Sequence, residues 1–378
     1  MLPLLRSLSA PLVSLVFMMM ASGLFNTFVS IRLEMEGFPP ESIGIVTSAL
    51  YMGILIGSLW ISRWISRVGH IRSFGVFAAV LALLVLAQAV WIDPWYWSSL
   101  RLIGGICMGG IFIVIESWLL IQSAPKMRGA ILSIYLAVLY AALSSGQLLI
   151  DVTDPKGIFP FCITAGLLAV SILPISLQKT AQPKLNNPVR LSLVQLFQIS
   201  PHGFIGGVIS GMVLAVVYGL VPVYAKAIGM NLSEIGTFMA VLIFGGFSLQ
   251  LPLGKWADKS DRRRILNLVS FITAFLALLM ALTSNLYLLF PLAWLFGGFS
   301  FTLYPLSMAY ACERVKEDQI VAATGGFVLS YALGAVGGPL MAPIAMSLFG
   351  GAGIFYFLGG ISLLLGLIGL KKAAPAID

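Results

Sequence analysis

The chain of 378 residues is 59% hydrophobic and only 10% charged, with a mean hydropathy of +1.01. Soluble domains are roughly a quarter charged, so this composition excludes a soluble globular protein and indicates an integral membrane protein. The net charge of +8 lies in segments between apolar runs, and we expect no nucleic-acid partner. Cys107, Cys162 and Cys312 lack paired spacing, so we expect no disulfide framework, metal site or cofactor.

Twelve apolar runs are each long enough to cross a bilayer, which takes about 20 residues. The first six are 12–31, 43–61, 74–91, 97–121, 130–149 and 158–177, and the second six are 204–224, 235–253, 265–282, 286–312, 322–346 and 354–370. These runs are too long for barrel strands and show no polar–apolar alternation. We therefore predict an all-α membrane protein with twelve transmembrane helices.

The second six runs repeat the first six in the same order. An offset of 192 positions pairs Gly53 with Gly245 and Trp64 with Trp256. Parallel repeats of this kind are typical of one large class of secondary transporters, whose substrate site lies between the halves. We predict two pseudo-symmetric six-helix halves, residues 1–177 and 201–378, joined by a cytoplasmic linker, residues 178–200.

Most of the 22 Lys and Arg residues fall on one side of the membrane when the N-terminus is placed inside. The positive-inside rule then predicts that both termini are cytoplasmic, and we expect the inner membrane of a bacterial cell. Residues 191–198 of the linker have two open interpretations. They form either a short amphipathic helix on the anionic inner leaflet or a polar tether.

Charged residues within a span are costly and usually mark a pathway or a pairing. Arg101 and Glu116 share one broad face of the fourth span with Gly105 and Gly109, but about 22 Å of helix separates the two charges. We predict that both act in proton coupling, with Glu116 as the proton carrier, because desolvation disfavours a charged carboxylate. The alternative is that each only satisfies a partner on a neighbouring helix.

Polar side chains on the first span suggest a lined cavity. Ser22, Asn26 and Ser30 recur at every fourth position, and the repeat places Asn26 opposite Tyr218. Polar groups inside a bundle need partners, and a helix–helix hydrogen bond is the alternative for each candidate. This set suits a moderately polar or amphipathic organic solute. The further candidates for substrate contact are Tyr51, Tyr140, Gln147, Gln250, Tyr304 and Tyr331.

Acidic and basic side chains alternate between the eighth and ninth spans, from Gly254 to Arg264. Ion pairs here would break and re-form as one half rocks against the other, so we predict a cytoplasmic gate. A purely topological role for these charges is the alternative. The gate candidates are Arg67, Gly69, Arg72, Gly254, Asp258, Lys259, Arg262, Arg263 and Glu313.

These residues resemble motifs of the major facilitator superfamily. The segment from Gly254 to Arg263 is similar to its loop signature G-x-x-x-D-(R/K)-x-G-R-(K/R), although Asp261 replaces the second glycine. The first-half copy keeps Arg67 and Gly69 but has Ser66 in place of the aspartate. The resemblance covers nearly the whole chain and implies a twelve-helix transporter.

Three further motifs carry the resemblance. Arg101–Gly105 is similar to the R-x-x-x-G signature that the family associates with proton coupling, and Arg128-Gly129 is similar to the pair that opens its fifth span. Gly334–Pro339 is similar to the G-x-x-x-G-P signature of its antiporters but lies in the eleventh span. The narrower likeness is to bacterial YcaD-like transporters, through segments such as Val114–Ser117 and Phe301–Pro305.

The residues and the resemblance together predict a monomeric secondary active transporter that moves a small organic solute by alternating access, coupled to protons. Its partners would be the solute, protons and membrane lipid. The chain has no G-x-x-x-x-G-K-(S/T) loop, so a gradient must supply the energy. We expect no enzyme, because His70 and His202 lie outside the apolar spans. The antiporter-like motif favours export; an importer, or a receptor or scaffold that transports nothing, stays open.

Overall fold

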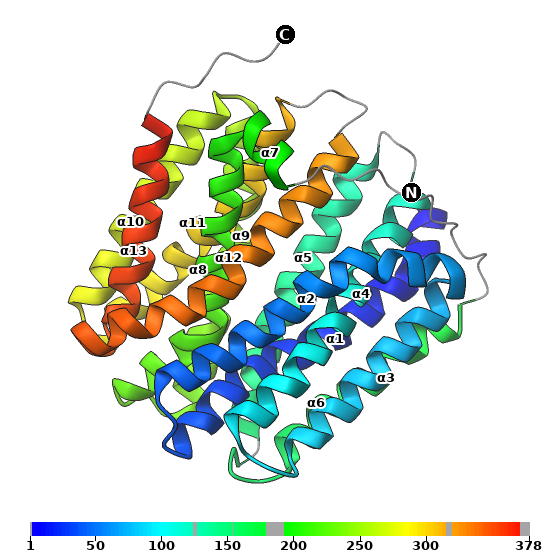
Figure 1. The fold of residues 1–378 in the computed structure, drawn as a ribbon, viewed down its shortest axis with the longest axis horizontal. Coiled ribbons are helices and arrows are strands. Elements are labelled where there is room, and N and C mark those ends of the chain that lie inside the picture. Colours follow the sequence, from blue (N-terminus) through cyan, green and yellow to red (C-terminus); the bar gives the residue numbers. More distant parts are fainter. Residues whose placement is uncertain (1, 124–126, 153, 179–192, 315–319, 371–378) are drawn as a thin grey trace. The chain divides into compact units, whose positions relative to one another are not determined.

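The computed structural model describes residues 2–123, 127–152, 154–178, 193–314 and 320–370, with side chains left out at 2–7, 128–130, 193 and 320–325 (Figure 1). Several basic residues of the predicted cytoplasmic segments therefore lie outside the described residues or side chains. They are Arg6, Lys126, Arg128, Lys179, Lys184, Arg190, Lys316, Lys371 and Lys372.

Over these residues the fold is helical, with α-helices, the short 3-10 helix η2 (Leu148–Val152) and no strand. The N-terminal helices are α1 (Leu2–Met35), α2 (Pro40–Val68), α3 (His70–Gln88), α4 (Pro94–Ile121), α5 (Arg128–Gln147) and α6 (Phe159–Ser176). The others are α7 (Leu193–Ile199), α8 (Pro201–Ala227), α9 (Leu232–Asp258), α10 (Arg262–Leu282), α11 (Leu286–Cys312), α12 (Ile320–Phe349) and α13 (Gly353–Leu370). Twelve of them, all except α7, are long and apolar enough to span a membrane, which confirms the predicted fold class.

Several helices are longer than the apolar runs that predicted them. α2 continues to Val68 and α9 to Asp258, so Arg67 and Gly254 lie on helical turns and not in loops. The apolar run marks only the part of a helix in hydrocarbon, whereas main-chain hydrogen bonding continues through the membrane interface. Exposed tryptophans at these helix ends, Trp64 and Trp256, are typical of that interface.

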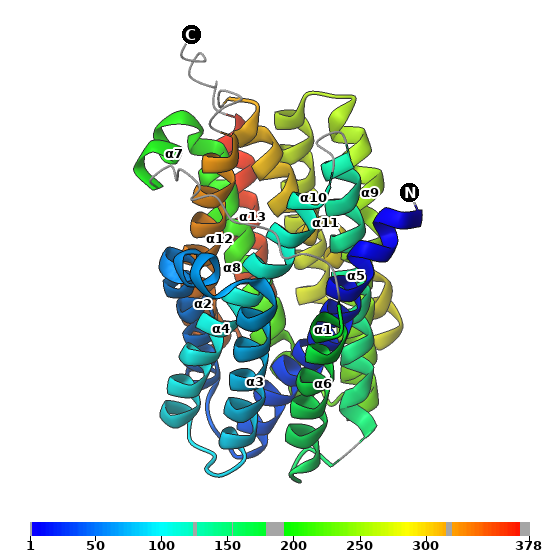
Figure 2. The same ribbon diagram turned by 90° about the vertical axis from the view of Figure 1, so that its right-hand side faces the viewer.

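The two halves have the same helix neighbours. α1 packs against α5 and α6, and α3 against α4 and α6 (Figures 1 and 2). In the C-terminal half, α8 packs against α12 and α13, and α10 against α11 and α13. Each C-terminal pair is the counterpart of an N-terminal one, so the sequence repeat is also a repeat in packing.

Glycines set the closest helix crossings at equivalent positions of the two halves. A Cβ atom on each of these glycines would overlap a main-chain carbonyl oxygen of the facing helix, so only glycine fits. The glycines and the residues whose oxygens they face are Gly53 with Leu102, Gly105 with Leu50, Gly245 with Trp294, and Gly297 with Leu242. Both members of each C-terminal pair lie 192 positions after their N-terminal counterparts.

The chain separates into two compact units. The first comprises Met1–Phe38, Ala49–Asn187 and Leu232–Ala240, and the second Pro39–Ser48, Pro188–Asn231 and Val241–Asp378. Each unit thus includes the beginning of one helix of the other repeat. In the second unit the Ser48 hydroxyl donates to the Val336 carbonyl at 2.8 Å. In the first, the Ser144 hydroxyl donates to the Ala240 carbonyl at 2.8 Å.

α7 lies in the segment predicted as the linker. Its Leu196 is fully buried against Ala311 and Phe327, while Val194 and Phe197 are exposed. The described part of residues 191–198 is therefore a short helix anchored by one apolar side chain. Residues 191 and 192 lie outside the described part of the chain.

Candidate functional site: a polar pocket and two charged clusters

Arg101 is held two turns into α4 by a well-defined helix start. Asp93 caps α4 by accepting a hydrogen bond from the Tyr96 amide at 2.8 Å, and Pro94 occupies the first turn. The Arg101 side chain is 7% exposed, and its Nη1 donates to Asn26 Oδ1 at 3.0 Å. Its guanidinium carbon lies 5.2 Å from the centre of the Phe25 ring, a cation–π contact.

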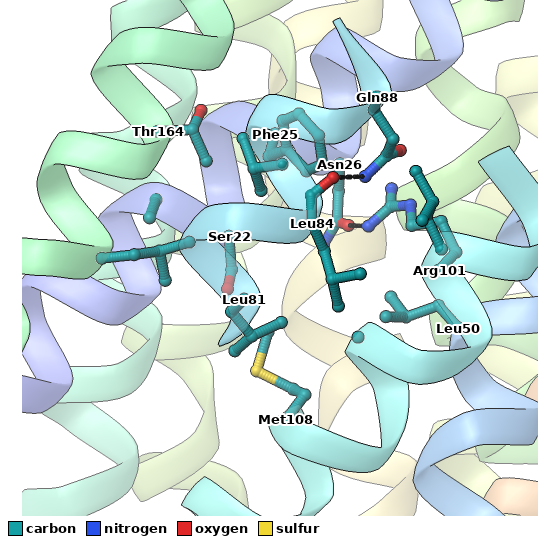
Figure 3. Close-up of a pocket in the computed structure, with 15 residues that line it drawn as sticks. Ser22, Phe25, Asn26, Leu50, Leu81, Leu84, Gln88, Arg101, Met108 and Thr164 are labelled. Carbon is teal, nitrogen blue, oxygen red and sulfur yellow. Dashed lines mark hydrogen bonds between the residues drawn. The ribbon is translucent and has the colours of Figure 1, made fainter. Parts of the chain in front are cut away.

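These residues border a pocket within the first unit. Figure 3 shows the Arg101 guanidinium reaching toward Asn26, with Gln88 close by. The pocket's polar wall consists of Ser22, Asn26, Gln88, Arg101 and Thr164. Its other walls are mainly apolar side chains of α1, α2, α3, α4 and α6. Its volume is about 40 Å³, far below the roughly 300–1,000 Å³ of organic ligand sites. This pocket therefore suits water or a small ion.

Three polar atoms around the pocket have no hydrogen-bond partner within the described part of the chain. They are Arg101 Nε, Ser22 Oγ and Gln88 Oε1. The described residues also supply no carboxylate paired with Arg101; its neighbours are the Asn26 amide and the Phe25 ring. Within the described part of the chain, the contacts of this cation are therefore with neutral groups.

Glu116 belongs to a separate cluster on the same helix. The Tyr135 hydroxyl of α5 donates to Glu116 Oε1 at 3.0 Å, and Glu116 does not line the pocket at Arg101. The following residue, Ser117, lies 3.0 Å from His70 Nε2. The acid and the cation of α4 thus have different surroundings, and each meets a partner on a neighbouring helix.

The two histidines differ from the sequence prediction. His70 and His202 are not outside the spans: they lie in the first turns of α3 and α8 and are 1% and 8% exposed. The predicted spans began only at the first apolar residues. A histidine in the first turn of a helix comes before that point, so both histidines were placed outside. In the described residues we find no group of three or more His, Cys, Asp or Glu side chains able to hold a metal.

The candidates for substrate contact divide between the units. Asn26, Tyr51, Tyr140 and Gln147 lie in the first, and Tyr218, Gln250, Tyr304 and Tyr331 lie in the second. Of the first four, only Asn26 lines the pocket at Arg101. Gln147 is fully buried, and Thr27 donates to its Oε1 at 2.5 Å.

Aromatic stacking dominates the second unit's candidates. The Tyr304 and Tyr331 rings meet edge-on at 5.0 Å between centres, and Tyr218 meets Phe301 edge-on at 5.7 Å. Gln250 is partly buried on α9. These half-buried rings offer an apolar face with a polar tip, the combination that suits an amphipathic solute.

Arg262 joins three helices of the second unit. It forms ion pairs with Asp258 of α9 at 2.8 Å and with Glu313, just after α11, at 3.2 Å. The neighbouring Arg263 donates through Nε to the Gly369 carbonyl of α13 at 3.0 Å. Lys259 is exposed beside this cluster. Ion pairs therefore connect the ends of α9, α10 and α11.

The first-half copy of the signature is built differently. Gly69 has φ 93° and ψ 161° and precedes α3 without a side-chain cap. Its counterpart Asp261 has φ −64° and caps α10 by accepting from the amides of Arg263 and Arg264. An aspartate is compatible with this position because its φ is not positive. Arg67 and Arg72 are exposed, and no described acidic side chain pairs with them.

Comparison with known proteins gives consistent matches over nearly the whole chain. The family model of the Major Facilitator Superfamily matches residues 12–202 and 203–376. The MFS-type transporter YcaD of Salmonella typhimurium, and that of Salmonella newport, are 30% identical over 364 residues, covering 96% of this chain and 94% of the relative.

Solved structures show the same fold at low sequence identity. A D-xylose-proton symporter superposes with a TM-score of 0.77 at 14% identity, covering 97% of both chains. The nucleoside transporter NupG superposes with a TM-score of 0.78 at 15% identity, covering 97% of this chain and all of its own (100%).

Proposed function

Because this chain belongs to the Major Facilitator Superfamily, whose members are transporters and not enzymes, we propose that it moves a small organic solute by alternating access, driven by a proton gradient. We place it in a bacterial inner membrane with both termini in the cytoplasm. The observation that carries the proposal is that α4, a helix able to span the membrane, holds Arg101 and Glu116, whose hydrogen-bond partners among the described residues are neutral. Charges within such a span are costly and usually functional.

Glu116 is the proposed proton carrier. A carboxyl group can accept a hydrogen bond in either protonation state, so the Tyr135 hydroxyl can hold Glu116 through a full cycle of proton loading and release. Arg101 supplies a fixed positive charge on the same helix. The solute would contact the polar and aromatic candidates already named, apart from Asn26, which lines the small pocket at Arg101. The Arg262 ion pairs would open and close at the cytoplasmic ends of the helices.

The motif that favoured export has a packing explanation. Gly334 and Gly338 of α12 lie against the main chain of α8 at Val208 and Met212. Gly146 of α5 makes the equivalent contact with α1, 192 positions earlier. Close helix packing therefore accounts for these glycines without an antiporter mechanism, and the proposal leaves the direction of transport to measurement.

The test of this function is transport by the purified chain in proteoliposomes under an imposed proton gradient of either sign. Solutes are first selected by thermal shift from a panel that includes D-xylose and nucleosides, the solutes in the names of the structural relatives. We expect Glu116→Gln to bind the selected solute but to lose gradient-driven accumulation, because an amide cannot release a proton.

The matched control is Glu41→Gln, which changes an exposed carboxylate in the first turn of α2 and should leave accumulation intact. If a Glu116→Gln variant still concentrates solute at the wild-type proton cost, Glu116 is not the proton carrier. Wild-type protein that moves neither protons nor any solute in the panel would favour the receptor alternative.

A further inference from the structure

The internal repeat provides a control for the pocket at Arg101. The positions that follow Ser22, Gln88 and Arg101 by 192 are Leu214, Met280 and Ala293, which are 4%, 0% and 0% exposed. Three of the five polar wall positions are thus apolar in the C-terminal half, and the other two, those of Asn26 and Thr164, are Tyr218 and Tyr356. Because the repeat packs apolar side chains at the positions of Ser22, Gln88 and Arg101, the buried cation is a feature of the N-terminal half alone among the described residues.

The pocket has an unbalanced charge. Arg101 is fully ionised in ordinary protein surroundings, and burial of a charge without a counter-charge is strongly unfavourable. Among the described residues its partners are neutral, and Arg101 Nε and Ser22 Oγ have no acceptor. Two unused donors, one on a cation, border an open volume. This arrangement favours the binding of an anion.

We propose that this pocket binds a small inorganic monovalent anion, of the size of chloride, against Arg101. The volume of about 40 Å³ holds roughly three water-sized groups, which is enough for one such anion and one or two waters. Arg101 Nε and Ser22 Oγ would donate to the anion. A water between the anion and Gln88 Oε1 would satisfy that acceptor, which is otherwise left without a partner.

The size and donor set also define what the pocket excludes. A sulfate, or an organic carboxylate larger than formate, exceeds the available volume, and a divalent anion would exceed the single positive charge. The anion would act as a counter-ion for Arg101, stabilising the N-terminal helices α1, α3 and α4 around it. The proposal concerns binding and is independent of the transported solute.

The test is the melting temperature of the detergent-solubilised chain as gluconate is replaced by chloride at constant ionic strength, without solute or gradient. We expect a saturable rise of about 2–4 °C, because a ligand that binds only the folded state stabilises it. Asn26→Asp should abolish the rise, since it places a carboxylate beside Arg101 Nη1 and supplies an internal counter-ion.

A matched pair of serine variants separates this site from general salt effects. Ser22→Ala removes one proposed donor and should weaken the chloride affinity several-fold. Ser362→Ala removes a buried hydroxyl of α13 that likewise has no hydrogen-bond partner among the described residues, and it should leave the chloride affinity unchanged. The proposal is overturned if the wild type melts at one temperature in both salts, as for a pocket filled by water alone. It is also overturned if Asn26→Asp keeps the full chloride effect. Neither result would bear on solute transport, which the vesicle assay decides.

Discussion

At the scale of single residues, the Tyr135–Glu116 hydrogen bond joins α4 to α5. We expect Tyr135→Phe to lower stability by about 1–3 kcal/mol, because a buried carboxyl group loses its donor while the ring is retained. Thermal melting in detergent measures the loss. Tyr356→Phe, at a side chain 37% exposed, is the control and should melt close to the wild type. Equal melting of the two variants would show that the bond contributes nothing.

The sequence could identify some of these residues but not their partners. Arg101 and Glu116 are conspicuous because charges inside apolar runs are rare. Asn26 is recognisable from its polar stripe, yet its bond to Arg101 joins residues 75 positions apart, which no local pattern encodes. Gln88 was missed because one amide near the end of an apolar run resembles a loop residue. Comparison with Met280 in the repeat is the signal that would have found it.

At the scale of helices, the crossing of α2 and α4 depends on glycine. A Cβ atom on Gly105 would overlap the Leu50 carbonyl, so we expect Gly105→Ala to destabilise the chain by about 1–3 kcal/mol through overpacking. Gly166→Ala in α6 is the matched control, because a Cβ atom there meets nothing within 4 Å. It should be neutral or slightly stabilising, since alanine is the better helix former. Melting curves that rank the two variants in the opposite order would refute this packing.

Helix ends were harder to predict than helix centres. Hydropathy located all twelve spans because a helix that crosses a bilayer needs about 20 mainly apolar residues, which stand out in the sequence. It placed the end of α2 near residue 61, whereas the helix continues to Val68. The backbone can stay helical in these last turns, because long charged side chains extend their polar ends into the membrane interface. Capping differences such as Gly69 and Asp261 depend on backbone angles, which composition does not reveal.

At the scale of the whole molecule, the two halves share packing but not chemistry. The glycine crossings repeat at the same spacing, whereas the buried polar cluster occurs at Arg101 and has an apolar counterpart at Ala293. The ion pairs of Arg262 likewise have no described equivalent at Arg67 or Arg72. Packing is set by helix geometry, so both halves retain it. The polar groups are free to diverge, and one half can specialise in ion handling.

The proposed orientation of the whole chain in the membrane can be tested by cysteine labelling. With the N-terminus inside, Asp154, between η2 and α6, faces the periplasm and Ser260, between α9 and α10, faces the cytoplasm; both are exposed. We replace Cys107, Cys162 and Cys312 by alanine and introduce one cysteine at either site. A membrane-impermeant maleimide added to spheroplasts should label Asp154→Cys at once and Ser260→Cys only after the membrane is permeabilised. The reverse order would invert the proposed topology, and labelling of both sites before permeabilisation would contradict a chain that places them on opposite sides of the membrane.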